Sequence, residues 1–138
     1  MTIEPERFII IMTKLIICIV AFSLTTINVC GQTTITVDST KISKDTEVNF
    51  YKTSMRGIES STKEIFYVDE NMQTLIALQN GQVKWRADII KTCGTPFVGN
   101  PSIRYLKLEH DKISVVYGKH DFASVDITTG KITCLGAD

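Results

Sequence analysis

The stretch QTLIALQNGQVKWRADI, residues 73–89, carries the clearest structural signal in the chain. Asn80-Gly81 at its centre predicts a two-residue β-hairpin turn, because both positions of that turn need a positive φ that asparagine and glycine tolerate. In the second arm Val83, Trp85, Ala87 and Ile89 alternate with Gln82, Lys84, Arg86 and Asp88. This alternation predicts an antiparallel sheet with one buried face and one face in solvent.

Short runs rich in β-branched and aromatic residues continue this pattern on both sides of the hairpin. The predicted strands span residues 33–37, 47–52, 64–69, 102–109, 112–117, 120–127 and 131–134. The two-residue links at 110–111 and 118–119 force the later strands into an antiparallel meander. Residues 54–63 and 92–101 are predicted to be loops, the second because it is rich in glycine and proline.

Two finer features complete the expected fold. The alternation breaks at Tyr105-Leu106, which predicts a β-bulge, and residues 128–130 are predicted to form the last turn. No amphipathic helix of useful length is expected between residues 32 and 138. The sequence therefore predicts an all-β fold of antiparallel meanders, arranged either as a two-sheet sandwich or as partial propeller-like blades.

The N-terminal region has the order of a secretory signal peptide. Lys14 precedes the apolar run LIICIVAFSL, and a polar stretch follows that run. Val29 and Gly31 are small residues at the third-last and last positions before the cleavage site. Residues 1–31 are therefore predicted to be a cleaved signal peptide, and residues 32–138 a single β domain.

This signal predicts a protein of the periplasm or a secreted protein. The apolar run at residues 15–24 is too short for a membrane span, so no stable membrane insertion is expected after cleavage. An alternative is a lipoprotein anchored through Cys30, although Val29 stands where such signals carry glycine or alanine. Translation starts at either Met1 or Met12, since the acidic residues between them are unusual ahead of a signal.

The charge of the chain excludes one class of partner. Its 138 residues include 15 Lys plus Arg and 15 Asp plus Glu, so the formal net charge is zero. Nucleic-acid binding depends on a basic surface. No nucleic-acid partner is therefore expected.

The cysteines divide between the two predicted parts of the chain. Cys18 and Cys30 lie in the signal peptide, which leaves Cys93 and Cys134 in the β domain. In an oxidising compartment these two are predicted to form a disulfide that closes a loop of about 40 residues. Two separate buried thiols are the alternative.

Two stretches of the β domain resemble each other: ALQNGQVKW at residues 77–85 and SVDITTGKITC at residues 124–134. Over residues 77–134 the chain is similar to the repeat of quinoprotein β-propellers, which has the form A-x-D-x-x-T-G-x-x-x-W. The second stretch matches at Ser124, Asp126, Thr129 and Gly130, with Cys134 in place of the tryptophan, and the first matches at Ala77, Gly81 and Trp85.

The resemblance implies structural roles for these residues. In that family the Asp and Thr-Gly hold the last turn of a blade, and the Trp docks onto the neighbouring blade. Two such blades cannot close a propeller, which needs at least about four. The resemblance therefore does not imply the quinone cofactor of the family, and no cofactor is expected.

The residue types that carry catalysis or metal binding do not converge in the sequence. His110 and His120 lie at opposite ends of the strand predicted at 112–117, which places them roughly 20 Å apart. Ser102 and Ser124 lack the Gly-x-Ser-x-Gly context of an activated nucleophile. No catalytic, cofactor-binding or metal-binding residue is predicted, and the protein is not expected to be an enzyme.

The sequence predicts an exported, non-enzymatic protein-interaction module, such as an immunity or inhibitor protein that binds and occludes another protein. The alternative is a small-ligand-binding or propeller-like accessory module of the cell envelope. Phe97 in the glycine- and proline-rich loop is either an interface anchor or a plug at the end of the sandwich. The candidate interface residues are Phe97, Val98, Tyr117, Lys119, His120 and Asp121.

Overall fold

A computed structural model describes residue 31 and residues 33–138 of the chain. The signal peptide predicted at residues 1–31, the alternative start at Met12, and Cys30 as a lipid attachment site concern residues outside this described part, apart from Gly31. Residues 33–138 make up almost all of the predicted β domain.

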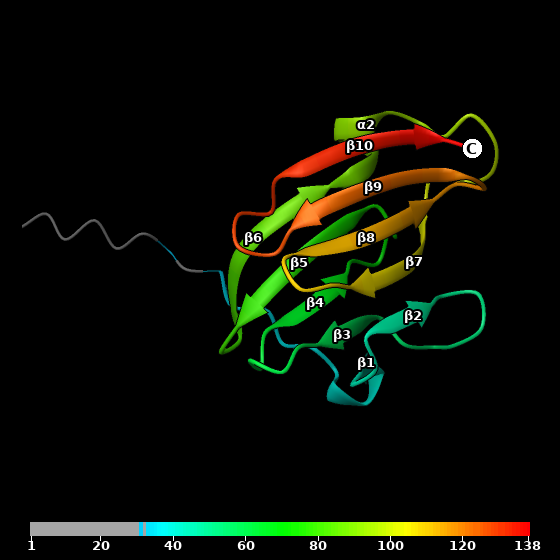
Figure 1. Cartoon of the computed structure of the whole chain (residues 1–138). Helices are drawn as coiled ribbons and strands as arrows, with labels where there is room; N and C mark the ends of the chain where they lie inside the picture. The colour runs from blue at the N-terminus through cyan, green and yellow to red at the C-terminus, as the bar shows by residue number, and fades with distance from the viewer. Residues whose placement is uncertain (1–30, 32) are drawn as a thin grey trace, which may run out of the picture. The chain divides into compact units, whose positions relative to one another are not determined.

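The β domain contains two sheets, each built on a four-stranded antiparallel meander (Figure 1). In the first sheet the order is β1-β3-β4-β5-β6, and β1 joins β3 in parallel, whereas the other pairs are antiparallel. Its strands are β1 (Ile42–Ser43), β3 (Gly57–Glu59), β4 (Ile65–Val68), β5 (Thr74–Gln79) and β6 (Gln82–Asp88).

The second sheet has the order β10-β9-β8-β7-β2 and is antiparallel throughout. Its strands are β2 (Glu47–Asn49), β7 (Ile103–Leu108), β8 (Lys112–Tyr117), β9 (Asp121–Asp126) and β10 (Ile132–Ala137). Two short helices accompany the sheets: the 3-10 helix η1 (Ser39–Lys41) before β1, and α2 (Ile89–Cys93) after β6.

The two sheets pack face to face around one hydrophobic core (Figure 1). Strand β8 supplies alternate residues to this core, since Ile113, Val115 and Tyr117 are buried, whereas the central strand β5 buries four consecutive residues from Leu75 to Leu78. The predicted all-β, two-sheet fold is confirmed. Both sheets contribute fully buried large side chains, which include Ile58, Phe66, Val68 and Leu75 from the first sheet and Ile103, Leu106, Ile113, Val115 and Val125 from the second.

The hairpin that decides the fold has the predicted turn. Asn80 and Gly81 have φ values of +52° and +76°, and Gln79 pairs with Gln82 across them. Trp85 is only 9% exposed, so the inward face of β6 was predicted correctly. The bulge expected near Tyr105 is also present, as a register shift between β7 and β8.

Several sequence-based expectations for the strands were wrong. The strand predicted at residues 33–37 is reduced to a single antiparallel bridge between Thr34 and Gln82. The loop predicted at 54–63 contains β3, which is too short to show an alternating pattern. Gly57 allows β3 to lie close to β4, since an added Cβ would approach the Tyr67 Cα within 3.0 Å.

The ends of two other strands also differ from the prediction. Strand β2 ends at Asn49 rather than at residue 52, because the Asn49 side chain accepts a hydrogen bond from the Tyr51 N–H and turns the chain. Ile89 starts helix α2 instead of ending β6, because the Asp88 carboxylate caps the helix by accepting from the Lys91 N–H.

Candidate interaction surface

The meanders place their connections at two opposite ends of the β domain (Figure 1). We call one end the turn end, which consists of the tight turns at residues 60–64, 80–81, 109–111 and 127–131. We call the other the loop end, which consists of the segments at residues 50–56, 69–73, 94–104, 118–120 and 135–138. The two ends use their side chains differently.

At the turn end, Asp126 holds the connection between β9 and β10. Its carboxylate accepts hydrogen bonds from the N–H groups of Thr128 and Thr129, at 2.9 and 2.8 Å, and from the Thr129 hydroxyl at 3.0 Å. The bonds from Thr129 are the main reason why the pKa of Asp126 lies below its usual value. The Asp126 carboxylate therefore stabilises the turn between β9 and β10.

Trp85 joins this turn to the other sheet. Its indole Nε1–H donates to the carbonyl oxygen of Ile127 at 2.9 Å, and its ring stacks with Phe66 at a centroid distance of 5.9 Å. A Cβ on Gly130 would lie 2.6 Å from the indole, so only glycine fits against the ring. The first meander is thereby fastened to the last turn of the second.

The turn end also contains the ion pairs of the β domain. Each pair joins a turn or a strand end to its neighbour, so lysines and glutamates here compensate each other. Among the described residues the ion pairs are Lys63–Glu59 at 2.7 Å, Lys84–Glu64 at 2.7 Å and Lys112–Glu109 at 3.5 Å.

The predicted disulfide between Cys93 and Cys134 is confirmed, with the two Cα atoms 5.6 Å apart. It joins the end of α2 to the middle of β10 and so connects the two meanders a second time. Cys93 also marks the point at which the chain enters the loop at residues 94–102. The disulfide therefore fixes one side of the loop end.

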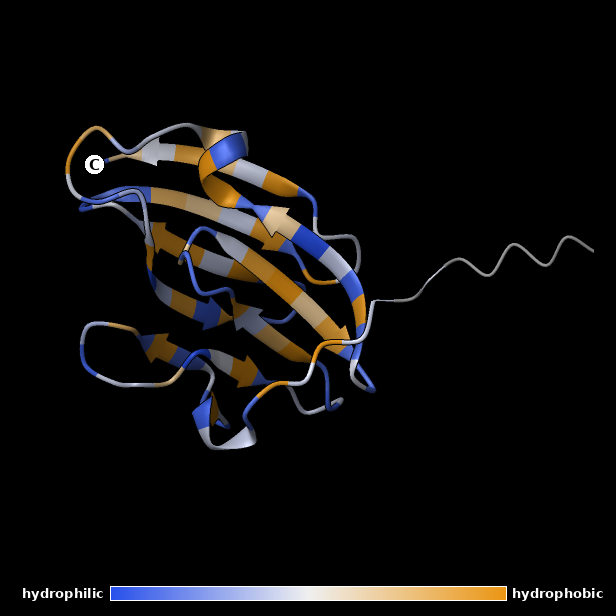
Figure 2. Ribbon diagram, turned by 180° about the vertical axis from the view of Figure 1, so that it is seen from behind, coloured by the Kyte–Doolittle hydropathy of each residue, from blue (hydrophilic) through white to orange (hydrophobic). Residues whose placement is uncertain are grey.

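The loop end exposes the large apolar side chains of the molecule. The exposed large hydrophobic residues of the described part of the chain are Tyr51 at 69%, Phe97 at 94%, Val98 at 46% and Leu135 at 63%. All of them lie on loop-end segments that come from three different parts of the sequence. Figure 2 shows part of the loop between α2 and β7 in hydrophobic colours beside the C-terminus.

The two segments that the sequence proposed as interface are in contact at the loop end. The Lys119 N–H donates to the Val98 carbonyl at 2.8 Å, and the Gly118 N–H donates to the Ser102 carbonyl at 3.1 Å. Gly99 and Gly118 both have positive φ, and a Cβ on Gly99 would lie 2.9 Å from the Lys119 nitrogen. Glycine thus allows the loop to lie against the β8–β9 turn.

The candidate interface residues differ in exposure. Phe97 points into solvent and does not plug the sandwich, because the buried Pro96 occupies the space beside Gly118 instead. Tyr117 was wrongly placed in the interface: it is 3% exposed, and the alternation of β8 turns it into the core. Val98, Lys119 and His120 are exposed, and Asp121 is half-buried.

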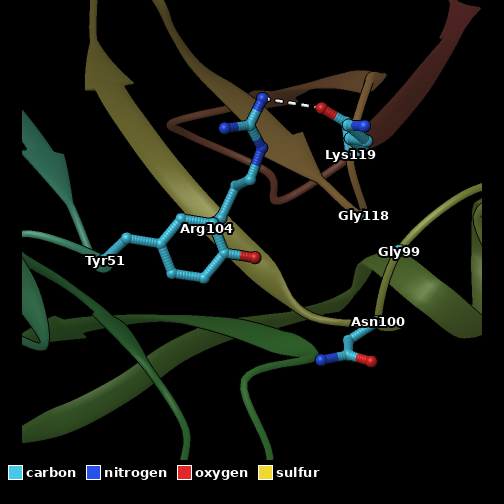
Figure 3. A pocket seen from close by; sticks show the side chains of 6 residues that line it. All are labelled: Tyr51, Gly99, Asn100, Arg104, Gly118 and Lys119. Atoms are coloured by element: carbon cyan, nitrogen blue, oxygen red, sulfur yellow. Dashed lines mark hydrogen bonds between the residues drawn. The ribbon is translucent and has the colours of Figure 1, made fainter.

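Sequence reasoning missed three residues of the loop end. Tyr51 was assigned to a strand, Arg104 lies in a β-strand without any local signal, and Leu135 follows the last predicted strand. A pocket of about 270 Å³ lies between these loops and is lined by Tyr51, Gly99, Asn100, Arg104, Gly118 and Lys119 (Figure 3). Only the tertiary fold brings these residues together.

The described residues contain no group of three or more His, Cys, Asp or Glu side chains placed to hold a metal ion. Over the same residues, no helix has the length and hydrophobicity to cross a membrane. His110 and His120 lie in the β7–β8 and β8–β9 turns, at the turn end and the loop end respectively.

Comparison of the chain with protein-family models, with curated proteins and with solved structures found no match.

Proposed function

We propose that this protein is an exported, non-enzymatic interaction module that binds another protein through its loop end. The observation that carries the proposal is the gathering of Tyr51, Phe97, Val98 and Leu135 on one end of the domain. Exposed apolar side chains that cluster on one surface are typical of protein interaction sites, whereas isolated ones are normal on any surface.

The way in which Phe97 is held supports this role. Its loop is bonded to the β8–β9 turn through Val98 and Lys119, and it begins at the Cys93 disulfide. An aromatic side chain on a loop that is already ordered loses little conformational entropy when a partner covers it. Phe97 and Tyr51 are therefore the expected anchors of the interface.

The mechanism follows from this arrangement. The loop end covers a site on the partner and blocks access to it, as an immunity or inhibitor protein does, and no bond is made or broken. The disulfide supports an exported protein, because such bonds persist in oxidising compartments.

Photo-crosslinking in the intact cell tests the proposal. A benzoyl-phenylalanine at position 97 is expected to crosslink one defined protein, and the same residue at Asp111 of the turn end serves as the matched control. Phe97→Ser is expected to reduce co-purification of that protein at least about tenfold, since a buried aromatic anchor contributes 2 kcal/mol or more. Equal crosslinking from positions 97 and 111 contradicts the proposal.

One observation favours a second candidate, a propeller-like accessory module. Trp85 contacts Ile127 and Gly130 of the next meander, which is the kind of contact that the repeat resemblance implies. In this alternative the partner is a larger protein built of similar meanders. Crosslinks from Arg86, on the outer face of β6, rather than from position 97 distinguish it from the first proposal.

A further inference from the structure

The pocket at the loop end has two cationic residues in its lining. Arg104 and Lys119 both line it, and neither forms an ion pair with any described residue. The six residues that line the pocket include no acid. At the turn end, by contrast, lysines next to glutamates are paired. The pocket is therefore a local concentration of uncompensated positive charge.

The guanidinium of Arg104 is only partly satisfied by the protein. Its Nη2 donates to the Lys119 carbonyl at 2.7 Å, as Figure 3 shows, whereas its Nε is buried and has no hydrogen-bond partner. A charge that is partly withdrawn from water without a counter-charge raises the free energy of the folded state. An anion in the pocket would recover part of this free energy.

The rest of the pocket suits the same kind of ligand. Tyr51 directs its hydroxyl toward the middle of the pocket, where it is available as a further hydrogen-bond donor (Figure 3). Gly99 and Gly118 keep the floor free of side chains. The guanidinium group matches the geometry of a carboxylate, with which arginine forms strong charge-assisted hydrogen bonds.

We infer that this pocket binds a carboxylate of the partner protein, one that lies next to an apolar side chain covering Phe97. This inference rests on the proposed function, because it assigns the charge at the centre of the same loop-end surface. It commits to a protein carboxylate because exposed Tyr51 lines the pocket beside the two cationic residues, and exposed Phe97 and Val98 immediately precede Gly99, which also lines it. Without these apolar neighbours, the positive charge of the pocket alone would suit any small anion.

The experiment uses a small probe that carries both features, 3-phenylpropionate, with the uncharged 3-phenylpropanamide as its matched control. Both are titrated into the ¹⁵N-labelled exported protein, and the Arg104 Nε–H and the amides of Gly118 and Lys119 are followed by NMR. Saturable shifts are expected with the carboxylate and not with the amide. Equal shifts with both compounds, or tighter binding of inorganic phosphate, would overturn the inference.

Variants assign the binding to the pocket. Arg104→Gln is expected to weaken binding of 3-phenylpropionate about tenfold or more, as for other charge-assisted hydrogen bonds. Arg86→Gln, an exposed arginine of β6, is the matched control and should bind like the wild type. If Arg104→Gln does not fold, Lys119→Gln takes its place, because the Lys119 side chain is exposed. Unchanged affinity in the folded variant contradicts the inference.

The two proposals fail in different ways. If position 97 crosslinks no partner while the pocket still binds 3-phenylpropionate through Arg104, the proposed function is wrong and the carboxylate pocket remains. If position 97 crosslinks a partner while Arg104→Gln alters neither probe binding nor co-purification, the interface remains and the carboxylate inference is wrong.

Discussion

The turn end and the loop end are built from the same strands, yet they treat polar and apolar side chains in opposite ways. At the turn end, Asp126 and Trp85 are bonded within the molecule, and lysines pair with glutamates. At the loop end, Phe97 is 94% exposed, and Arg104 forms no ion pair with any described residue. This difference teaches that the turn end uses its polar side chains within the fold, whereas the loop end leaves large apolar and charged side chains without partners in the described residues.

Removal of the Trp85 side chain tests the turn end most severely. Trp85→Ala is expected to lower the free energy of unfolding by about 3–5 kcal/mol, because it leaves a cavity between the sheets and removes the bond to Ile127. Urea unfolding followed by circular dichroism measures the change. Tyr51→Ala, at the loop end, is the matched control and should change stability by less than about 0.5 kcal/mol. Equal losses in the two variants would remove the distinction between the ends.

Removal of the disulfide affects both meanders, since it connects α2 to β10. The double variant Cys93→Ser/Cys134→Ser is expected to lose about 3–4 kcal/mol by the chain-entropy model of a cross-linked loop. The same unfolding experiment measures it. Thiol titration of the unfolded, unreduced chain of residues 32–138 should find no free cysteine, and two free thiols per chain would contradict the bond.

The hairpin turn gives a smaller effect at the turn end. Gly81→Val should destabilise the fold by about 1–3 kcal/mol, because a β-branched residue resists the positive φ of this position. No heavy atom lies near an added Cβ at Gly81, so the loss reports backbone conformation alone. Gly81→Asn, which tolerates the same φ, is the control and should lose much less. A Gly81→Val variant with the same free energy of unfolding as the wild type would contradict the prediction and show that the turn can change its backbone conformation.

Tyr105 provides a pH-dependent test between the two ends. Its hydroxyl donates to Glu47 at 2.6 Å, and this bond together with burial raises the pKa of Tyr105 to about 12. The stabilisation is thus fully present below pH 10, near the unfolded pKa, and is lost as the pH rises toward 12. From pH 9 to pH 11 the urea concentration at the unfolding midpoint should fall further for the wild type than for Tyr105→Phe. An identical fall in the two proteins would contradict the hydrogen bond between Tyr105 and Glu47.

The smallest expected effect on stability belongs to the residue with the largest expected effect on binding. Phe97→Ser should change the free energy of unfolding by less than about 0.5 kcal/mol, because its side chain is 94% exposed. Thermal and urea unfolding of the variant measure this. A loss above about 1 kcal/mol would place Phe97 among the residues that hold the fold.

The local parts of this structure were predictable from the sequence. The Asn80-Gly81 hairpin and the β7–β10 meander follow from turn chemistry and alternation between near neighbours in the chain. The pairing of Cys93 with Cys134 was predictable because they are the two cysteines of the predicted β domain. Strand β3 was missed because its three residues are too few to show an alternation of apolar and polar side chains.

The candidate site was predictable only in part. Phe97 and Val98 stood out as apolar residues in a glycine- and proline-rich loop. Tyr51 and Arg104 did not, because their roles depend on contacts between segments that are remote in sequence. Tyr117 was misplaced because it lies next to the β8–β9 turn. The alternation of β8 nevertheless turns its side chain into the core.

The placement of Trp85 and Cys134 has a consequence for how the molecule unfolds. Each residue lies four positions after the glycine of its turn, but Trp85 joins the first meander to the second, whereas Cys134 joins the second back to the first. In an array of repeats that each contact only the next, terminal units separate independently. Here the two meanders cannot separate while the Trp85–Ile127 hydrogen bond and the Cys93–Cys134 disulfide are intact. We therefore expect both meanders to unfold in one cooperative transition.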